Sequence, residues 1–302
     1  MKRLVAWIFI LSGAFIIGTN KDNLIILYAR YVKETDIRTI TYRNEYYRNV
    51  DYEYVQITDE FLIKSKKELL NVYYTVLNSG TTNFYFYCDE SYDRCVDDVI
   101  DFANNQHILS NLNSFVHPYN SFDSIETNYN TFGRIEIKIN RVYDDDLIYD
   151  INMEVDRVLN KLVEDTSDVK EFVKTIHDYI ISISDYDVDK ADKKITNYLS
   201  NTAYGPLLQG YAICSGYTDA MALFLHRYNI PNFKIVSENH IWNVVMIDGE
   251  WYHLDLTWND PVLSDGTDTI DYTYFLITTE ELLEIEKTQH NFDLAVFSEV
   301  IG

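Results

Sequence analysis

The segment 240–258 constrains the fold more than any other part of the chain. Asp248-Gly249 stands between two runs rich in Val, Ile, Trp and Tyr, a pattern that predicts a β-hairpin with a two-residue turn. In that register Trp242 faces Asp255, and His240 is a diagonal neighbour of Asp255 on the same face. A three-residue loop would shift the pairing by one position and separate the two side chains. The hairpin therefore predicts an imidazole beside a carboxylate.

A second segment, 209–228, predicts an amphipathic helix that begins near Cys214. Apolar residues recur at steps of three and four positions, which is the helical period. Asn229 and Pro231 should end the helix, because Asn tolerates the left-handed conformation and Pro cannot continue a helix. At a helix start, unsatisfied N–H groups and the positive end of the dipole favour a thiolate. Cys214 is therefore a candidate nucleophile.

Cys214, His240 and Asp255 together suit a nucleophile, a base and the carboxylate that orients the base. Each residue also has an ordinary interpretation. A lone Cys is most often a small buried hydrophobic residue, a His is often a satisfied core residue, and an Asp often lies in a turn. The combination favours catalysis, because a thiol at a helix start accompanies a His and an Asp in one hairpin.

Three blocks of sequence closely resemble the core of the bacterial transglutaminase-like superfamily. They are Cys214-Ser-Gly-Tyr217, His240-Ile-Trp-Asn243 and the segment 248–258. Weaker resemblances lie at 177–180, 185–187, 202–205, 271–275 and 280–281, so that the similarity covers about the last half of the chain. One departure is Asn229, where the family usually has Gly.

The resemblance implies a papain-like α+β fold in which a Cys-bearing helix packs against an antiparallel sheet. It also implies a triad of Cys214, His240 and Asp255 that transfers the acyl group of a carboxamide or peptide carbonyl. It leaves open whether water or an amine receives the acyl group. His253 is the rival to His240, because it shares the face of Asp255 on the same strand. We prefer His240, which matches the family block.

The supporting roles have several candidates. For the oxyanion, the backbone N–H of Cys214 is the natural donor, with Gln209 or Tyr204 as side-chain candidates. Trp242 and Trp258 are candidates for the walls of the acyl site, although packing of the hairpin against the core is the better explanation for both.

Composition limits the organisation and the partners. A chain of 302 residues with 47% hydrophobic content is long enough for two domains. We predict a small α/β domain over 40–146 and the catalytic domain over 150–302. The net charge of −23 argues against nucleic-acid binding, since phosphates would be repelled. The oligomeric state is left open.

Local patterns predict further elements. Strands are expected at 51–57 and 82–87, with one or two more within 125–142, and helices at 65–77, 96–116, 151–164 and 168–183. A polar break is expected at Asp144–Asp146 between the two domains.

The N-terminal segment 1–22 reads as a signal peptide or membrane anchor. Lys2-Arg3 precede an apolar run from Leu4 to Ile17, which is short for a membrane span, and no good cleavage site follows. Either interpretation places the catalytic domain outside the cytoplasm, and a buried first helix is the alternative. Cys88 and Cys95 either pair, which suits export, or are two buried thiols.

No metal or cofactor is expected. The alternation in Asp185–Asp189 resembles a calcium loop, but Lys190 stands where Gly is needed, which favours a solvated turn. Three functional classes follow. The first is an exported peptidase or amidohydrolase acting on protein or cell-wall peptide, the second is a cross-linking transglutaminase, and the third is a non-catalytic binding module. An intact triad argues against the third.

Overall fold

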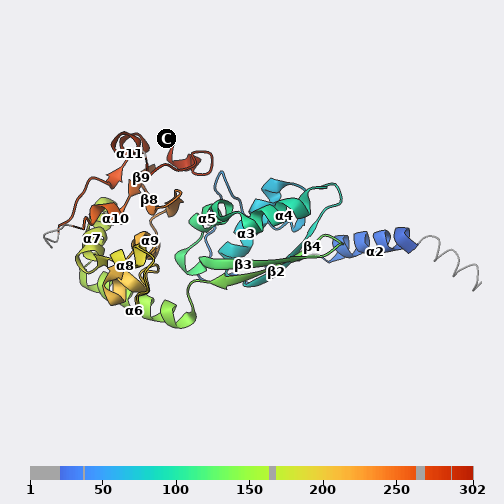
Figure 1. Ribbon diagram of the computed structural model, residues 1–302, viewed down its shortest axis with the longest axis horizontal. Coiled ribbons are helices and arrows are strands. Elements are labelled where there is room, and N and C mark those ends of the chain that lie inside the picture. The colour runs from blue at the N-terminus through green and yellow to red at the C-terminus, as the bar shows by residue number, and fades with distance from the viewer. Residues whose placement is uncertain (1–20, 37, 163–167, 263–268, 287, 302) are drawn as a thin grey trace, which may run out of the picture.

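The computed structural model describes residues 21–36, 38–162, 168–262, 269–286 and 288–301. Figure 1 shows an elongated molecule in which helix α2 (Lys21–Thr35) extends from one end. A sheet with its helices forms the middle, and the C-terminal half forms the other end. The predicted signal or anchor lies almost wholly outside the described residues. Within the described part of the chain, no helix has the length and apolar character needed to span a membrane.

The middle of the molecule is a four-stranded mixed sheet in the order β1-β2-β4-β3. Strand β1 runs parallel to β2, and the other pairs are antiparallel. Ile135, Ile137 and Ile139 of β4 are buried, while the intervening Glu136 and Lys138 are exposed, so one face packs and the other is open. The elements are β1 (Leu62–Ile63), α3 (Lys66–Ser79), β2 (Asn83–Cys88), α4 (Cys95–Asn104), α5 (Gln106–Ser114), η1 (Pro118–Asn120), β3 (Phe122–Tyr129) and β4 (Arg134–Arg141).

Most of the elements predicted for this region are confirmed, and two are corrected. Residues 51–57 form no strand, because the Asp51 side chain accepts the backbone N–H of Ile57 and the segment folds on itself. The helix predicted over 96–116 is two helices. Asn105 separates them, because its side-chain oxygen accepts the N–H groups of His107 and Ile108 and so caps a new helix.

Cys88 and Cys95 form a disulfide that joins the end of β2 to the start of α4. Their Cα atoms are 5.8 Å apart, a normal separation for a disulfide. We expect the double substitution Cys88→Ser, Cys95→Ser to lower the free energy of unfolding by about 2–3 kcal/mol, since the short loop is no longer closed in the unfolded chain. Urea denaturation of both proteins measures the difference. An unchanged midpoint, or free thiols at both positions in the untreated protein, would contradict this expectation.

The C-terminal half contains an antiparallel sheet in the order β10-β9-β8-β7. Helix α9 contacts β7 and β8, so the fold is α+β with the Cys214 helix against an antiparallel sheet. The elements are α6 (Asp145–Leu162), α7 (Val169–Ser182), β5 (Asp185–Tyr186), α8 (Val188–Ala191), η2 (Gly205–Gln209), β6 (Tyr211–Ala212), α9 (Cys214–Arg227), β7 (Asn232–Val236), β8 (Ile241–Ile247), β9 (Glu250–Leu254), α10 (Leu256–Asn259), β10 (Phe275–Ile277), α11 (Thr279–Ile285) and η3 (Ser298–Val300).

The polar run Asp144–Asp146 begins in the connection between β4 and α6, as a break would, and continues into the helix. Asp144 accepts the backbone N–H of Leu147, and α6 begins at Asp145, because acidic residues stabilise a helix N-terminus. The end of α9 follows the prediction, with Asn229 at φ 58°.

Buried side chains connect the two halves. Phe115 of the N-terminal part stacks on Phe233 of β7, with ring centroids 5.5 Å apart. Lys234 of β7 donates to Ser121 at 3.2 Å and to Asp219 of α9 at 3.0 Å. One hydrophobic cluster includes residues from both parts. The predicted domain limits stay a prediction, but the sheet that carries His240 packs directly on the N-terminal part.

Candidate active site

The 240–258 hairpin has the predicted register. Asp248 and Gly249 form the turn with φ values of 56° and 89°, and Ile247 pairs with Glu250. Positive φ at both central residues is the signature of the turn type that joins twisted antiparallel strands. Because the register holds, His240 and Asp255 lie on the same face.

Asp255 follows directly after β9 and serves two structures at once. Its Oδ1 atom accepts the N–H groups of Thr257 and Trp258, at 3.0 and 3.2 Å, and so caps helix α10. Its Oδ2 atom lies 2.5 Å from Nε2 of His240. Both residues are buried, with exposed fractions of 2% for Asp255 and 5% for His240. Since an ionised carboxylate can only accept, Nε2 of His240 carries the proton.

This pairing changes the pKa values of both groups. Burial by itself lowers the pKa of His240, but the charge of Asp255 and hydrogen bonds to Asp255 and the Cys214 thiol outweigh burial and raise it to about 10. Burial raises the pKa of Asp255, but the charge of His240 and hydrogen bonds from His240 and His290 bring it well below its usual range. The imidazole therefore favours its charged form.

The raised pKa of His240 predicts a pH dependence of stability. A group whose pKa is higher in the folded than in the unfolded state stabilises fully below its unfolded pKa of about 6.5. That contribution is lost as pH rises from there to the folded value of about 10. We expect the free energy of unfolding, measured in urea over this range, to fall more steeply for the native chain than for His240→Gln. If the free energies of unfolding of the two proteins changed in parallel with pH, the raised pKa of His240 would be contradicted.

Cys214 is the first residue of α9 and carries a free, half-buried thiol. No side chain caps this helix. The backbone N–H groups of its first turn, where Cys214 lies, therefore have no side-chain acceptor. The loop before it packs closely, since the N–H of Ile213 donates to the carbonyl of Ser200 at 2.8 Å. At Gly216 a Cβ atom would lie 2.2 Å from that same carbonyl oxygen. Glycine there is therefore required by close approach, and it positions the helix start.

Hydrogen bonds join the Cys214 helix to the His240 strand. The Thr218 hydroxyl lies 2.7 Å from the carbonyl oxygen of Cys214 and 3.0 Å from that of Ile241. The Asn243 side chain donates to the carbonyl of Thr218 at 3.0 Å. The hydrogen bond between the thiol and the imidazole contributes to the raised pKa of His240. Because Nε2 bonds Asp255, Nδ1 is the ring nitrogen available to the thiol.

His253 belongs to a different network. Its Nδ1 accepts the indole N–H of Trp242 at 2.9 Å, and its Nε2 lies 3.0 Å from the Thr279 hydroxyl. Burial and the neighbouring His290 lower the pKa of His253 to about 3, so it stays neutral. Both ring nitrogens are used in packing, which removes His253 from competition with His240.

The predicted supporting residues have structural contacts. Trp242 is buried, stacks on His240 with centroids 5.5 Å apart and bonds His253, as packing of the hairpin would require. Trp258 is half-buried, 6.4 Å from the His240 ring. Gln209 accepts the backbone N–H of Leu199 at 2.7 Å through its side-chain oxygen, which orders the loop before Cys214. Tyr204 packs against the hydrophobic cluster around α9. Oxyanion roles for Gln209 and Tyr204 stay predictions.

The structure adds a residue that the sequence analysis missed. Nε2 of His290 lies 2.9 Å from Oδ2 of Asp255, the same oxygen that bonds His240. Nδ1 of His290 lies 3.2 Å from Oε2 of Glu286. The sequence signal is weak, because a Glu and a His four positions apart, 35 residues beyond Asp255, match no catalytic pattern.

His240, Asp255 and His290 also form a group whose ligand atoms lie within 4.8 Å of one another. Two atoms that share a tetrahedral zinc ion at about 2.0–2.1 Å are about 3.3 Å apart. The carboxylate oxygen lies 2.5 and 2.9 Å from the two imidazole nitrogens, which are hydrogen-bond distances. The group is therefore a hydrogen-bonded array centred on Asp255.

The turn at 185–189 is exposed at Asp185 and Asp189, as predicted, but it is not solvated at Asp187. Asp187 is buried, accepts the Ser200 hydroxyl at 2.6 Å and caps α8 through the N–H of Lys190. It thus orders the loop that contacts the start of α9.

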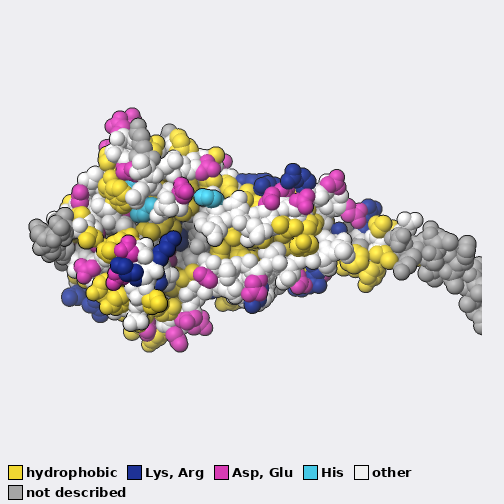
Figure 2. Space-filling view, viewed as in Figure 1, with side chains coloured by type: hydrophobic (Ala, Val, Ile, Leu, Met, Phe, Trp, Pro, Cys, Tyr) yellow, Lys and Arg dark blue, Asp and Glu magenta, His cyan; other side chains and the backbone are white. Residues whose placement is uncertain are grey.

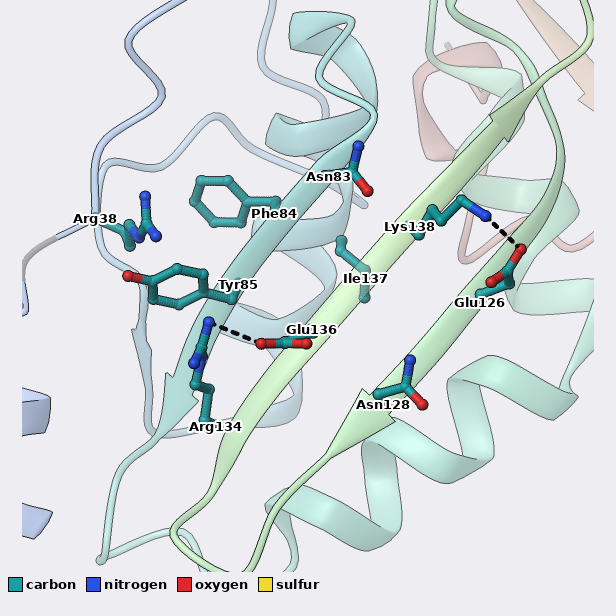
Figure 3. Close-up of a pocket in the computed structure, with 10 residues that line it drawn as sticks. All are labelled: Arg38, Asn83, Phe84, Tyr85, Glu126, Asn128, Arg134, Glu136, Ile137 and Lys138. Carbon is teal, nitrogen blue, oxygen red and sulfur yellow. Dashed lines mark hydrogen bonds and ion pairs between the residues drawn. The ribbon is translucent and has the colours of Figure 1, made fainter.

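The open face of the β2-β4-β3 sheet contains a hollow of about 480 Å³, shown in Figure 3. Arg38 and Arg134 lie over the Tyr85 ring, 3.5 and 4.0 Å from its centroid. Glu136 pairs with Arg134, and Lys138 pairs with Glu126. The residues that line this hollow include no Cys, His or Ser, so we assign no nucleophilic chemistry to the hollow.

Comparison with known proteins gives partial structural similarities. A solved structure described as a TGase has a TM-score of 0.35 and 13% identity, and the match covers 51% of this chain and 48% of that one. A structure described as a putative cysteine protease from Cytophaga hutchinsonii has a TM-score of 0.28 and 12% identity, over 49% of this chain and 65% of that one. The chain thus spans less than two thirds of either protein. No family model matches the sequence, and no curated protein does.

Proposed function

We propose that this protein is a thiol-dependent acyl-transfer enzyme acting on carboxamide or peptide bonds of proteins or peptides. The observation that carries the proposal is the buried hydrogen bond between Nε2 of His240 and Asp255. The Cys214 thiol is among the groups that raise the pKa of the same imidazole. An imidazole next to a thiol can take its proton, and the resulting sulfur anion is the attacking form. The sequence resemblance described above supports the same chemistry.

The proposed reaction has two stages. The Cys214 sulfur attacks the carbonyl carbon, and the electron pair of the C=O bond moves to oxygen, where the N–H groups at the start of α9 stabilise it. The C–N bond then breaks as the His240 imidazolium gives its proton to the leaving amine or ammonia. Water or an amine next loses a proton to His240 and attacks the thioester, which releases Cys214. Asp255 keeps the ring orientation throughout.

Two variants of this function differ in the acceptor. In the first, water completes a peptidase or amidohydrolase reaction on protein or cell-wall peptide. In the second, a lysine amine completes the cross-link of a transglutaminase. The uncapped helix start and the buried His240–Asp255 pair serve both reactions equally.

The deciding experiment uses the purified full chain with a glutamine-rich protein and a labelled amine. Incorporation of the label indicates transamidation, peptide fragments indicate proteolysis, and release of ammonia alone indicates deamidation. Each product must disappear in Cys214→Ala. The proposed function would be contradicted if none of the three products formed with a range of protein and peptide substrates.

We also propose that the catalytic half lies outside the cytoplasm, because the apolar N-terminal segment 1–22 has the pattern of an export signal or a membrane anchor. The Cys88–Cys95 disulfide supports this location, because disulfides persist in oxidising compartments. Helix α2 supports attachment near a membrane, since it exposes the large apolar side chains of Leu24, Ile26, Leu27, Tyr28 and Tyr31. The yellow surface at the α2 end of the molecule in Figure 2 includes this region. Labelling of Cys214 in intact cells by a membrane-impermeant thiol reagent tests the location, and labelling only after lysis would contradict it.

A further inference from the structure

We propose that His290 is a positioning residue for the Cys214–His240–Asp255 site and that Glu286 holds it in place. This inference rests on the proposed function and extends it. It is based on one carboxylate oxygen, Oδ2 of Asp255, that contacts two buried imidazoles. The distances are 2.5 Å to His240 and 2.9 Å to His290.

The hydrogen bonds to Asp255 show what His290 adds. Oδ1 accepts two backbone N–H groups of α10, and Oδ2 accepts both imidazoles, so four donors surround one carboxylate. A carboxylate with two oxygens has about four acceptor positions. His290 therefore occupies the remaining position. It blocks rotation of the carboxylate away from His240, because any rotation would break several hydrogen bonds at once.

His290 is itself firmly held. Its side chain is fully buried, and Tyr274 stacks on it with centroids 5.1 Å apart. Trp242 and Trp258 contact the ring edge-on, at 4.8 and 5.1 Å. The second ring nitrogen faces Glu286, so both nitrogens have carboxylate partners and the ring plane is determined.

Glu286 is anchored in turn by its own neighbours. Its side-chain oxygens accept the backbone N–H groups of Thr288, Gln289 and His290. Burial raises the pKa of Glu286, but the Thr288 hydroxyl and these N–H groups outweigh burial and lower it to about 2. The carboxylate is thus ionised at neutral pH and remains an acceptor for His290. The C-terminal segment after α11 thereby completes a site whose other members come from α9 and the hairpin.

The test compares two variants of similar side-chain volume, His290→Gln and His290→Leu. The Gln amide retains a donor that can reach Asp255, whereas Leu has none. We expect kcat for acyl transfer to fall by roughly 10- to 100-fold in the Leu variant, as for loss of one hydrogen bond to a charged group, with KM little changed. The Gln variant should restore most of the activity. If the Leu variant does not fold, His290→Asn replaces it, because the shorter amide does not reach Asp255.

A matched control is His117→Asn. His117 is equally buried, and its ring nitrogen accepts the N–H of Tyr119 at the start of η1, a role that Asn can fill. Its ring contacts are Tyr46, Tyr119 and His226, none of which belongs to the proposed site. This variant should retain native kcat.

A second readout is the rate of iodoacetamide labelling of Cys214 as a function of pH. Misplacement of Asp255 lowers the pKa of His240, so the labelling profile of the Leu variant should differ from that of the native chain and of the control. Native kcat and a native profile in a folded Leu variant would overturn the role of His290. Failure of the proposed function looks different, because the native chain itself would then show no product and no rapid labelling.

Discussion

Cys214→Ala is expected to lower kcat/KM for acyl transfer by about 10⁴-fold or more, because no other group in the site can form the thioester. Cys88 and Cys95 are joined in a disulfide, so Cys214 is the free cysteine of the described chain. The substitution removes a half-buried thiol at a helix start and leaves the backbone contacts of the loop unchanged. Steady-state kinetics on the substrate found with the labelled amine measure the loss.

The control for this prediction is the Cys88→Ser, Cys95→Ser variant, which changes stability but retains the thiol at position 214. It should keep native kcat below its melting temperature. The rate at which iodoacetamide labels Cys214 at neutral pH provides an independent check, since a thiol beside a charged imidazole reacts faster than a free thiol. Retained turnover in Cys214→Ala, or labelling no faster than a model thiol, would leave the fold without the proposed chemistry.

Asp255→Asn is expected to reduce kcat by roughly 10³- to 10⁴-fold while the protein remains folded, as found when the carboxylate of a similar triad becomes an amide. The amide oxygen can still cap α10 in place of Oδ1. The amide nitrogen that replaces Oδ2 is a donor and cannot accept from His240. The ring then loses both its orientation and the charge that raises its pKa.

Asp168→Asn is a matched control for Asp255→Asn. Asp168 caps α7 by accepting the N–H groups of Lys170 and Glu171, as Asp255 caps α10. The same substitution thus leaves a helix cap intact at both positions, but only one of them contacts His240. Kinetics and melting curves of the two variants separate the roles. Equal activity of the two variants would show that the carboxylate of Asp255 serves only as a helix cap.

Local sequence determined the parts of the site that depend on neighbouring residues. The Asp248-Gly249 turn has positive φ at both positions and sets the register that places His240 beside Asp255. The helical period located α9, and Asn229 ends it in the left-handed conformation, as expected. These features were predictable because turn geometry and helix ends depend on short-range sterics.

Tertiary structure decided what depends on distant partners. The segment 51–57 has the composition of a strand, but it finds no neighbouring strand and packs as irregular chain. His253 matched the face of Asp255, yet the indole N–H of Trp242 makes it a packing residue. The Cys88–Cys95 bond was one of two equal expectations until the chain path brought both sulfurs together.

His290 shows the same division within the site. The hairpin residues were found because His240 and Asp255 are close in sequence and share a regular element. His290 lies in an irregular segment, and its hydrogen bond to Asp255 depends on the path of the chain through β10 and α11. The sequence by itself determined the hairpin, its register and the helix that carries Cys214. Only tertiary structure decided which buried groups meet around Asp255, because burial and hydrogen bonding between distant segments have no local pattern.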